Sequence, residues 1–459
     1  MSRIILLTLA MLASATTFSQ TPIVLNTDEV GNIAILGGTL ISISGNGRYA
    51  MFRARQPLIA EDTSNGGQIY VRDLETGTLE LVTVTPNGSP ATNGGTVPDS
   101  SLSTPRLLSD NGRIALFASD SEDILPGTIL PIIGQNLQLY LRDLDAGVTV
   151  HVSVDSDNNP ANGSVIEYTL DPSGLAVLFS SNATNLDPMF TQPALTYLHR
   201  VDAPVGSSVR TQAACRDRDG VARPCNRFSL SCGGALTAFA GGASFPWIEG
   251  EDLPPGQIYS DIFIGNTIPG NWKRLGAEVD PPIIPDGTAR NGIAPSINCT
   301  GDRLAFISLD PLITGDSNGE RDLHIYNLLS GQFFLLQNSP GESFGASTVS
   351  LSTDGSVVAF LTPNNIDPDD SNFIAFQDAY AIYLPRDIIP PLSAEWISQS
   401  NRSGADSTLM VYAGNLAAIG FRALTTGPNW PGNGSPGSSP HLYVQGSPSA
   451  RIFNSRFQP

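Results

Sequence analysis

One phrase recurs along almost the whole chain and constrains its fold more than any other feature. The phrase is Ser-x-x-Gly-Arg-x-Ala-x-Phe, followed after a variable stretch by Ile-Tyr-x-x-Asp-Leu-x-x-Gly and a short apolar run. Its clearest copy runs from Leu108 to Phe117 and resumes from Leu139 to Gly147. A sequence repeat of this kind indicates a fold assembled from one structural unit. The first halves of the seven copies end at Phe52, Phe117, Phe179, Phe239, Phe306, Phe360 and Phe421.

Each copy predicts two β-hairpins. Short apolar runs bounded by Asn-Gly, Asp-Gly or Thr-Gly are typical of strands joined by tight turns. In the first copy, 40–44, 48–52, the segment around Tyr70 and 79–84 are expected to form strands A, B, C and D. The 45 Gly and 35 Pro residues among 459 argue against long helices. We therefore predict an all-β fold, a seven-bladed β-propeller of four-stranded antiparallel blades, with six or eight blades as alternatives.

The beginning of the chain predicts an export signal. Arg3 precedes the apolar run Ile4 to Leu12 and the small-residue pattern Ala13-Ser14-Ala15, which is typical of a signal peptide and its cleavage site. A second cut after Gln20 stays open. The expected division is a signal peptide and cleavage region at 1–20, an N-terminal strand segment that could close the ring at 21–38, and a single propeller domain at 39–459.

The charge balance argues against several classes of partner. The net charge is −19, with 24 basic residues against 43 acidic ones. Nucleic acid and anionic membrane surfaces are not expected partners, because no basic stripe is present to neutralise phosphates. No later segment approaches the roughly 18 apolar residues that an integral membrane helix needs. We expect a monomeric periplasmic or secreted protein.

The four cysteines fit an oxidising compartment and allow three pairings. Cys215 and Cys225 enclose a polar, turn-rich loop that a local disulfide would close. Cys232 and Cys299 both stand where Asp110 stands in the second repeat, in neighbouring repeats four and five. A bridge between them would join adjacent blades if their Cα atoms lie within about 7 Å. Two buried thiols at these positions are the alternative.

The repeats resemble the WD40-like (PD40) repeats of TolB-type bacterial β-propellers. The resemblance is carried by the Gly-Arg-x-Ala-x-Phe phrase, by the phrase from Ile69 to Gly77, and by the linkers 88–94 and 159–163. It covers approximately residues 40–455 and implies a propeller fold. TolB itself carries an α/β domain before its propeller, for which too few residues precede the first repeat here. A TolB-like envelope partner is therefore not implied.

Alternating strand direction would place the tight A–B and C–D turns on one rim of the disc and the long B–C and D–A connections on the other. Binding residues concentrate on loops held by a rigid scaffold, so the long-loop rim is the predicted binding face. Trp247 and Trp430 lie in these loops. Each could stack on a sugar or anchor a protein contact, or could fold back to plug its own loop.

Acidic loops also suggest a calcium site. Asp316, Asn318 and Asp322 offer oxygens at intervals that could surround a hard cation. The complete EF-hand spacing is missing, and the same residues fit ordinary turn chemistry. Both interpretations stay open, and no other cofactor is expected.

The sequence favours an exported, non-catalytic propeller that binds a protein or glycan partner through the face carrying the long B–C and D–A loops. The alternative is a propeller lyase or hydrolase that acts at the axial channel with loop carboxylates. The segment 341–345 matches Gly-x-Ser-x-Gly, but it lies in a linker of a β repeat, where the strand-to-helix turn of that motif is not expected. We assign no catalytic residues, and enzymatic activity stays open.

Overall fold

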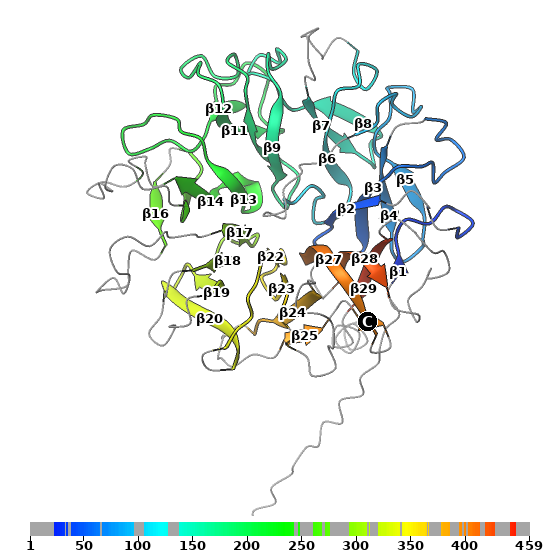
Figure 1. Cartoon of the computed structure of the whole chain (residues 1–459). Coiled ribbons are helices and arrows are strands. Elements are labelled where there is room, and N and C mark those ends of the chain that lie inside the picture. The colour runs from blue at the N-terminus through cyan, green and yellow to red at the C-terminus, as the bar shows by residue number, and fades with distance from the viewer. Residues whose placement is uncertain are drawn as a thin grey trace, which may run out of the picture.

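The computed structural model shows an all-β propeller, whose sheets are arranged around a central axis (Figure 1). Among the described residues the only helical element is a short 3₁₀ turn, Cys232–Gly234, and no helix is long and apolar enough to cross a membrane. The described residues are 23–32, 34, 38–64, 67–95, 105–126, 137–242, 247, 260–268, 271–275, 293–309, 312, 320–339, 342–364, 366, 378–385, 394–396, 399–400, 403–413, 418–426 and 441–446.

Six blades follow one another along the chain, and in each the neighbouring strands are antiparallel. Blade 1 contains β2 (Gly38–Ile43), β3 (Tyr49–Ala54), β4 (Gln68–Asp73) and β5 (Leu79–Leu81); blade 2 contains β6 (Ile114–Ser119), β7 (Gln138–Asp143) and β8 (Val148–His151); blade 3 contains β9 (Val165–Leu170), β10 (Ala176–Ser181), β11 (Leu195–Arg200) and β12 (Thr211–Ala213).

Blades 4 to 6 continue the same order, with the first strand of each blade nearest the axis (Figure 1). Blade 4 contains β13 (Asn226–Leu230), β14 (Leu236–Gly242), β15 (Ser260–Asn266) and β16 (Trp272–Arg274); blade 5 contains β17 (Ile293–Ile297), β18 (Arg303–Ser308), β19 (Asp322–Asn327), β20 (Gln332–Ser339) and β21 (Glu342–Ser343); blade 6 contains β22 (Thr348–Leu351), β23 (Val357–Thr362), β24 (Asp378–Tyr383) and β25 (Ala394–Trp396).

The remaining sheet combines both ends of the described chain, and we call it the closing sheet. Its order is β1 (Ile23–Val24), β29 (His441–Gly446), β28 (Ala418–Thr426), β27 (Ser403–Ala413) and β26 (Gln399–Ser400). Strand β1 pairs antiparallel with β29 and so covers a strand edge that would otherwise be open.

The prediction of seven uniform four-stranded blades, one for each repeat, is therefore corrected. Six blades form from consecutive strands, and the strands of the last repeat share their sheet with β1. In blade 2 the expected inner strand contributes one isolated bridge, Leu108 to Ala115, and leaves a three-stranded sheet. Sequence spacing located the repeats, but the pairing of their outer edges depends on where the chain ends meet.

The core of each of the six blades contains a cross-strand aromatic pair. The second strand supplies Phe and the third supplies Tyr, Phe or His directly opposite, with ring centroids 5.4 to 6.0 Å apart. Such pairs add to the free energy gained by burial alone. The pairs are Phe52–Tyr70, Phe117–Tyr140, Phe179–Tyr197, Phe239–Phe263, Phe306–His324 and Phe360–Tyr380.

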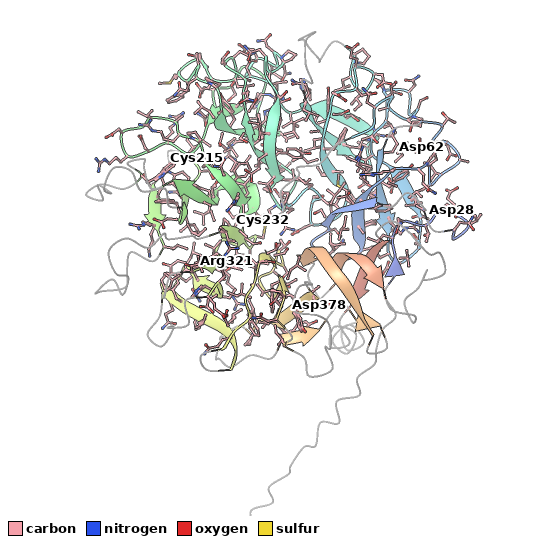
Figure 2. All side chains as sticks on the ribbon, in the orientation of Figure 1. Asp28, Asp62, Cys215, Cys232, Arg321 and Asp378 are labelled. Carbon is pink, nitrogen blue, oxygen red and sulfur yellow. A yellow bond between two sulfur atoms is a disulfide. The ribbon has the colours of Figure 1, made fainter. Side chains whose placement is uncertain are left out.

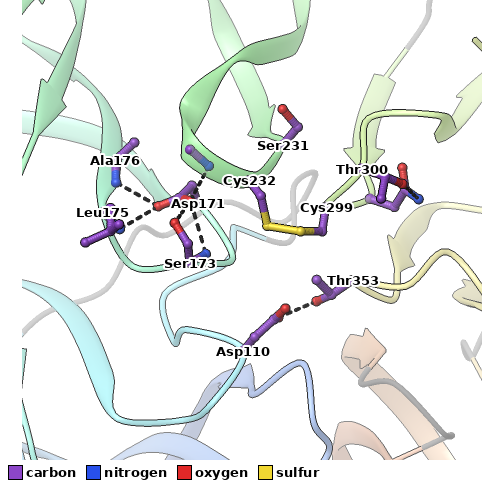
Figure 3. The surroundings of a disulfide bond; sticks show 12 residues. Asp110, Asp171, Ser173, Leu175, Ala176, Ser231, Cys232, Cys299, Thr300 and Thr353 are labelled. Carbon is purple, nitrogen blue, oxygen red and sulfur yellow. Dashed lines mark hydrogen bonds between the residues drawn. A yellow bond between two sulfur atoms is a disulfide. The ribbon is translucent and has the colours of Figure 1, made fainter.

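The turns between the first two strands of the six blades lie around the axis and are bonded to one another. Backbone hydrogen bonds join Asn46 to Asp110 (2.9 Å), Asp110 to Pro172 (2.8 Å), and Cys299 to both Cys232 (3.0 Å) and Thr353 (2.8 Å). The Thr353 hydroxyl also donates to the Asp110 carboxylate at 2.6 Å, which links blades 6 and 2 across the axis (Figure 3). The tight-turn rim is thus one hydrogen-bonded network.

Two disulfides form. Cys215–Cys225 closes the connection between blades 3 and 4, and Cys232–Cys299 joins blades 4 and 5 within the axial network (Figure 3). The Cα atoms of the second pair are 4.6 Å apart, because the turns of the two blades are neighbours at the axis. Two disulfides indicate an oxidising, extracytoplasmic environment.

Replacing Phe117 by Ala should lower the free energy of unfolding by about 3 to 5 kcal/mol, because it removes a fully buried ring and leaves a cavity. Val148→Ala on the outer strand of the same blade, where Val148 is 50% exposed, should stay within about 0.5 kcal/mol of the parent. Equilibrium denaturant unfolding measures both values. Equal losses in the two variants would contradict the role given to the aromatic pair.

The two disulfides should contribute unequally to stability. They close loops with sequence separations of 67 and 10 residues. In the chain-entropy description the double variant Cys232→Ser/Cys299→Ser should lose about 4 kcal/mol, and Cys215→Ser/Cys225→Ser about 3 kcal/mol. Denaturant unfolding of the two double variants gives the comparison. A larger loss for the short loop would show that loop length does not decide the contribution here.

Candidate functional site

The structure describes one of the two tryptophans of the predicted binding face. Trp247 is only 3% exposed and packs against Phe239, Phe263 and Trp272, with ring centroids 4.9 to 6.4 Å away. Its indole plugs the outer core of blade 4 and offers no free face for stacking on a ligand. Trp430 lies outside the described residues, so its role stays a prediction.

The predicted calcium ligands are only partly described. Asp322 begins β19 and is buried, whereas Asp316 and Asn318 lie outside the described residues. Over the described part of the chain, no group of three His, Cys, Asp or Glu side chains is placed to hold a metal ion. The calcium site stays a prediction.

On the tight-turn rim, hydrogen bonds and the Cys232–Cys299 disulfide join the described turns around the axis. Beyond these turns, hydroxyls on the inner strands bind the neighbouring blades. Ser42, Ser229 and Ser296 accept hydrogen bonds from the backbone N–H groups of Leu107, Ile297 and Leu351, at 2.9 to 3.3 Å.

A polar recess of about 210 Å³ opens on the long-loop rim between blades 1 and 2. The ends of β3 and β6, the start of β7 and the linker between the blades form it, because all of these segments reach the same rim. Its lining consists of Arg53, Asn93, Gly94, Gly95, Ser119, Asp120 and Leu137.

Glycine at position 94 allows the linker to pass close to blade 1. Gly94 has a φ of +66°, and a Cβ there would lie 2.1 Å from the carbonyl oxygen of Gly67. The Gly94 carbonyl accepts a hydrogen bond from Ser119, and the Asn93 side chain donates to Asp120 at 3.4 Å. The recess therefore has a fixed backbone and several polar groups at its surface.

Arg53 is the main charged donor of the recess. Its Nε donates to the Gly67 carbonyl at 3.4 Å, and within the described residues no carboxylate lies within 4.0 Å of its guanidinium. Burial, with the neighbouring charge of Arg55, lowers the pKa of Arg53. A guanidinium that remains charged still has N–H groups directed to solvent or to a ligand.

The three histidines whose side chains the structure describes lie within the blades. Desolvation lowers the pKa of His151 to about 4, and burial lowers those of His199 and His324 to about 3. His151 contacts Gln138 and Ser153, and His199 contacts Thr211; none of the three bonds to a described carboxylate. They lie on outer strands and so are not placed for catalysis at the axis.

Sequence inspection missed the recess residues for a physical reason. Arg53 follows the repeated Phe52 directly and looked like the start of a loop, and Asn93-Gly94 resembled linker sequence. Their convergence requires the packing of blade 1 against blade 2. The polar Asn-Gly pair in the linkers at 93–94 and 162–163 was the available signal, since it marks where the chain returns to the inner strand.

No family model and no curated relative matches the chain. Among solved structures, the β-propeller domain of the trilobed protease from Pyrococcus furiosus is 10% identical over 86% of this chain and 93% of its own, with a TM-score of 0.48. An oligogalacturonate lyase from Vibrio parahaemolyticus is 11% identical over 89% and 90%, with a TM-score of 0.47. The Swd1 propeller domain of Myceliophteria thermophila is 12% identical over 90% and 97%, with a TM-score of 0.43.

These similarities concern the fold alone, and no activity of those proteins is assigned to this chain. The assignment as a β-propeller rests on the sheets themselves. The resemblance to TolB-type repeats is thus supported at the level of the propeller fold, while membership of that family stays a prediction.

Replacing His324 by Phe should stabilise the protein and reduce its acid sensitivity. His324 is fully buried, and neither ring nitrogen has a hydrogen-bond partner. Because its folded pKa of about 3 lies below the unfolded value of about 6.5, the stability of the neutral form is present above pH 6.5 and is lost as the pH falls. The variant's advantage should grow by about 2 kcal/mol from about pH 8 to about pH 5.

His151→Phe is the matched control. It should destabilise the protein at neutral pH, because it removes the hydrogen-bond partner of Gln138 and Ser153. Denaturant unfolding at both pH values measures the two variants. An advantage of His324→Phe that does not change with pH would contradict the low folded pKa.

Proposed function

We propose that this protein is a non-catalytic propeller that binds a glycan through its long-loop rim. The recess between blades 1 and 2 would contact one sugar residue of the chain. Its volume of about 210 Å³ suits one small group rather than a large ligand. A protein partner is the competing occupant of the same rim.

The mixture of groups in the recess carries the proposal. A guanidinium, an amide, a carboxylate and a hydroxyl line one small space, in Arg53, Asn93, Asp120 and Ser119. Sugar hydroxyls are both donors and acceptors, so a lining of mixed polarity can satisfy them. A purely apolar lining would favour a hydrophobic side chain of a protein partner instead.

We propose in addition that this protein is exported. The signal-like pattern from Arg3 to Ala15 lies outside the described residues. The two disulfides support maturation in the periplasm or outside the cell, since such bonds persist in oxidising compartments. A glycan of the cell envelope or the surroundings would be accessible to a protein located there.

Affinity electrophoresis against a panel of neutral and acidic soluble polysaccharides tests the proposal. At least one polysaccharide should retard the mature protein, and Arg53→Met and Asp120→Asn should weaken that interaction about tenfold, because each removes a charged hydrogen-bonding group. Arg48→Met and Glu75→Gln, on the tight-turn rim, are the matched controls and should bind like the parent.

Two outcomes would contradict the proposal. One is the absence of retardation by every polysaccharide, which would favour a protein partner for this rim. The other is equal binding by the recess variants and the controls, which would place the contact elsewhere on the propeller. Hydrolysis or elimination products released from the polysaccharide would instead support the enzymatic alternative.

A further inference from the structure

A second pocket, of about 220 Å³, lies between blades 4 and 5 at the tight-turn rim. Strands β14 and β16 begin at this rim, and β15 and β19 end there, so all four strands reach the pocket. Its lining includes three aliphatic side chains, two asparagines, one tyrosine and one lysine. Nearer the axis, the Cys232–Cys299 disulfide joins the turns of the same two blades (Figure 2).

The apolar walls of this pocket continue the core between the two blades. Ile264 and Tyr326 belong to one cluster of buried side chains, and Leu236 and Leu328 pack against that cluster. All four residues also line the pocket. The walls are therefore fixed by the packing of blade 4 on blade 5, and an apolar group that enters between them leaves water for a preformed apolar surface.

Lys273, the only lysine of the chain, brings a positive charge to the pocket. It stands directly opposite Ile264 in the pairing of β15 with β16, so both side chains lie on the same face of blade 4. Its Nζ donates to the Tyr326 hydroxyl of blade 5 at 2.6 Å and lies 5.2 Å from the centroid of that ring. The equivalent positions in the other blades hold no cation, so this charge is particular to blade 4. They are Glu80, Val150, Gln212, Phe334 and Glu395.

The Tyr326 hydroxyl is a buried donor at the pocket. Tyr326 is only 2% exposed, and its oxygen accepts the hydrogen bond from Lys273. A phenol can also donate, but within the described part of the chain the Tyr326 O–H has no acceptor. The hydroxyls of Tyr70 and Tyr197, which are buried as well, donate to the Asp62 carboxylate and to the Ala183 carbonyl. A ligand atom that accepts from Tyr326 would satisfy the remaining donor, since an unpaired buried donor is costly.

We propose that this pocket binds a small aliphatic monocarboxylate. A carboxylate oxygen accepts the Tyr326 O–H, and the ammonium of Lys273 supplies the opposite charge. The aliphatic chain of the ligand lies against the leucine and isoleucine walls. No acidic residue is among those that the structure describes in the lining, so the lining itself does not repel an anion. The recess at Arg53 lies on the opposite rim, so either proposal can fail without the other.

Isothermal titration calorimetry of the full mature protein with hexanoate tests the site. Hexanoate should bind saturably, whereas acetate, which lacks the chain, and hexanamide, which lacks the charge, should each bind at least tenfold more weakly. Lys273→Met and Tyr326→Phe should each weaken hexanoate binding tenfold or more, because each removes one partner of the carboxylate. Arg48→Met removes a positive charge from the same rim in blade 1 and should bind hexanoate like the parent.

A second measurement needs no substitution and so stays decisive if a variant does not fold. Reductive ¹³C-methylation labels one side chain, that of Lys273, besides the N-terminal amine, and it keeps the positive charge. The methyl signal of Lys273 should shift saturably with hexanoate and stay in place with hexanamide. Lack of hexanoate binding by the parent protein, equal affinities for hexanoate and hexanamide, or unchanged hexanoate affinity in both Lys273→Met and Tyr326→Phe would overturn the proposal. An equal loss in Arg48→Met would overturn it as well.

Discussion

The stacked aromatic pair between the second and third strands of each blade is the contact on which this fold depends. It is repeated in six blades with nearly the same geometry, from Phe52–Tyr70 to Phe360–Tyr380. Each pair fixes the register of its two strands, because a shift of one residue would move a ring to the opposite face. The repeat of the sequence is therefore a repeat of one physical contact. Blade 5 departs from it with His324, whose nitrogens have no partner.

The two rims of the propeller differ in structure. On one rim, turns, the Cys232–Cys299 disulfide and the Thr353–Asp110 hydrogen bond join several blades around the axis. Gly45 belongs to this rim, since any side chain there would collide with Asp110. These bonds fix the described turns of one rim, and the proposed glycan-binding face is the opposite one. The proposed recess at Arg53 lies on that opposite rim, where β3 and β6 end and β7 begins.

Much of the fold could be predicted from the sequence, because the residues that indicate strands and turns lie close together in the chain. Turn residues and the repeated Phe indicated the strands, and the aligned repeats placed Cys232 and Cys299 at equivalent positions in neighbouring copies. The predicted number of blades was less accurate, because the last strand, β29, pairs with β1, which is far away in the sequence. For Trp247 the sequence left open a ligand contact or a plug of its own loop, and the structure shows that Phe239 and Trp272 pack against its buried indole. The recess was not predicted, because it joins segments from blades 1 and 2.

The sequence by itself determined the all-β repeat, the strand-turn pattern and the division into a tight-turn rim and a long-loop rim. These properties depend on residues close together in the chain, whose conformational preferences act locally. Only the tertiary structure decided that strands from both ends of the described chain share the closing sheet, that hydrogen bonds and a disulfide join the turns around the axis, and that Arg53 and Asp120 line one recess. Such features arise from packing one blade on the next, where the side chains that meet are about one repeat or more apart in sequence.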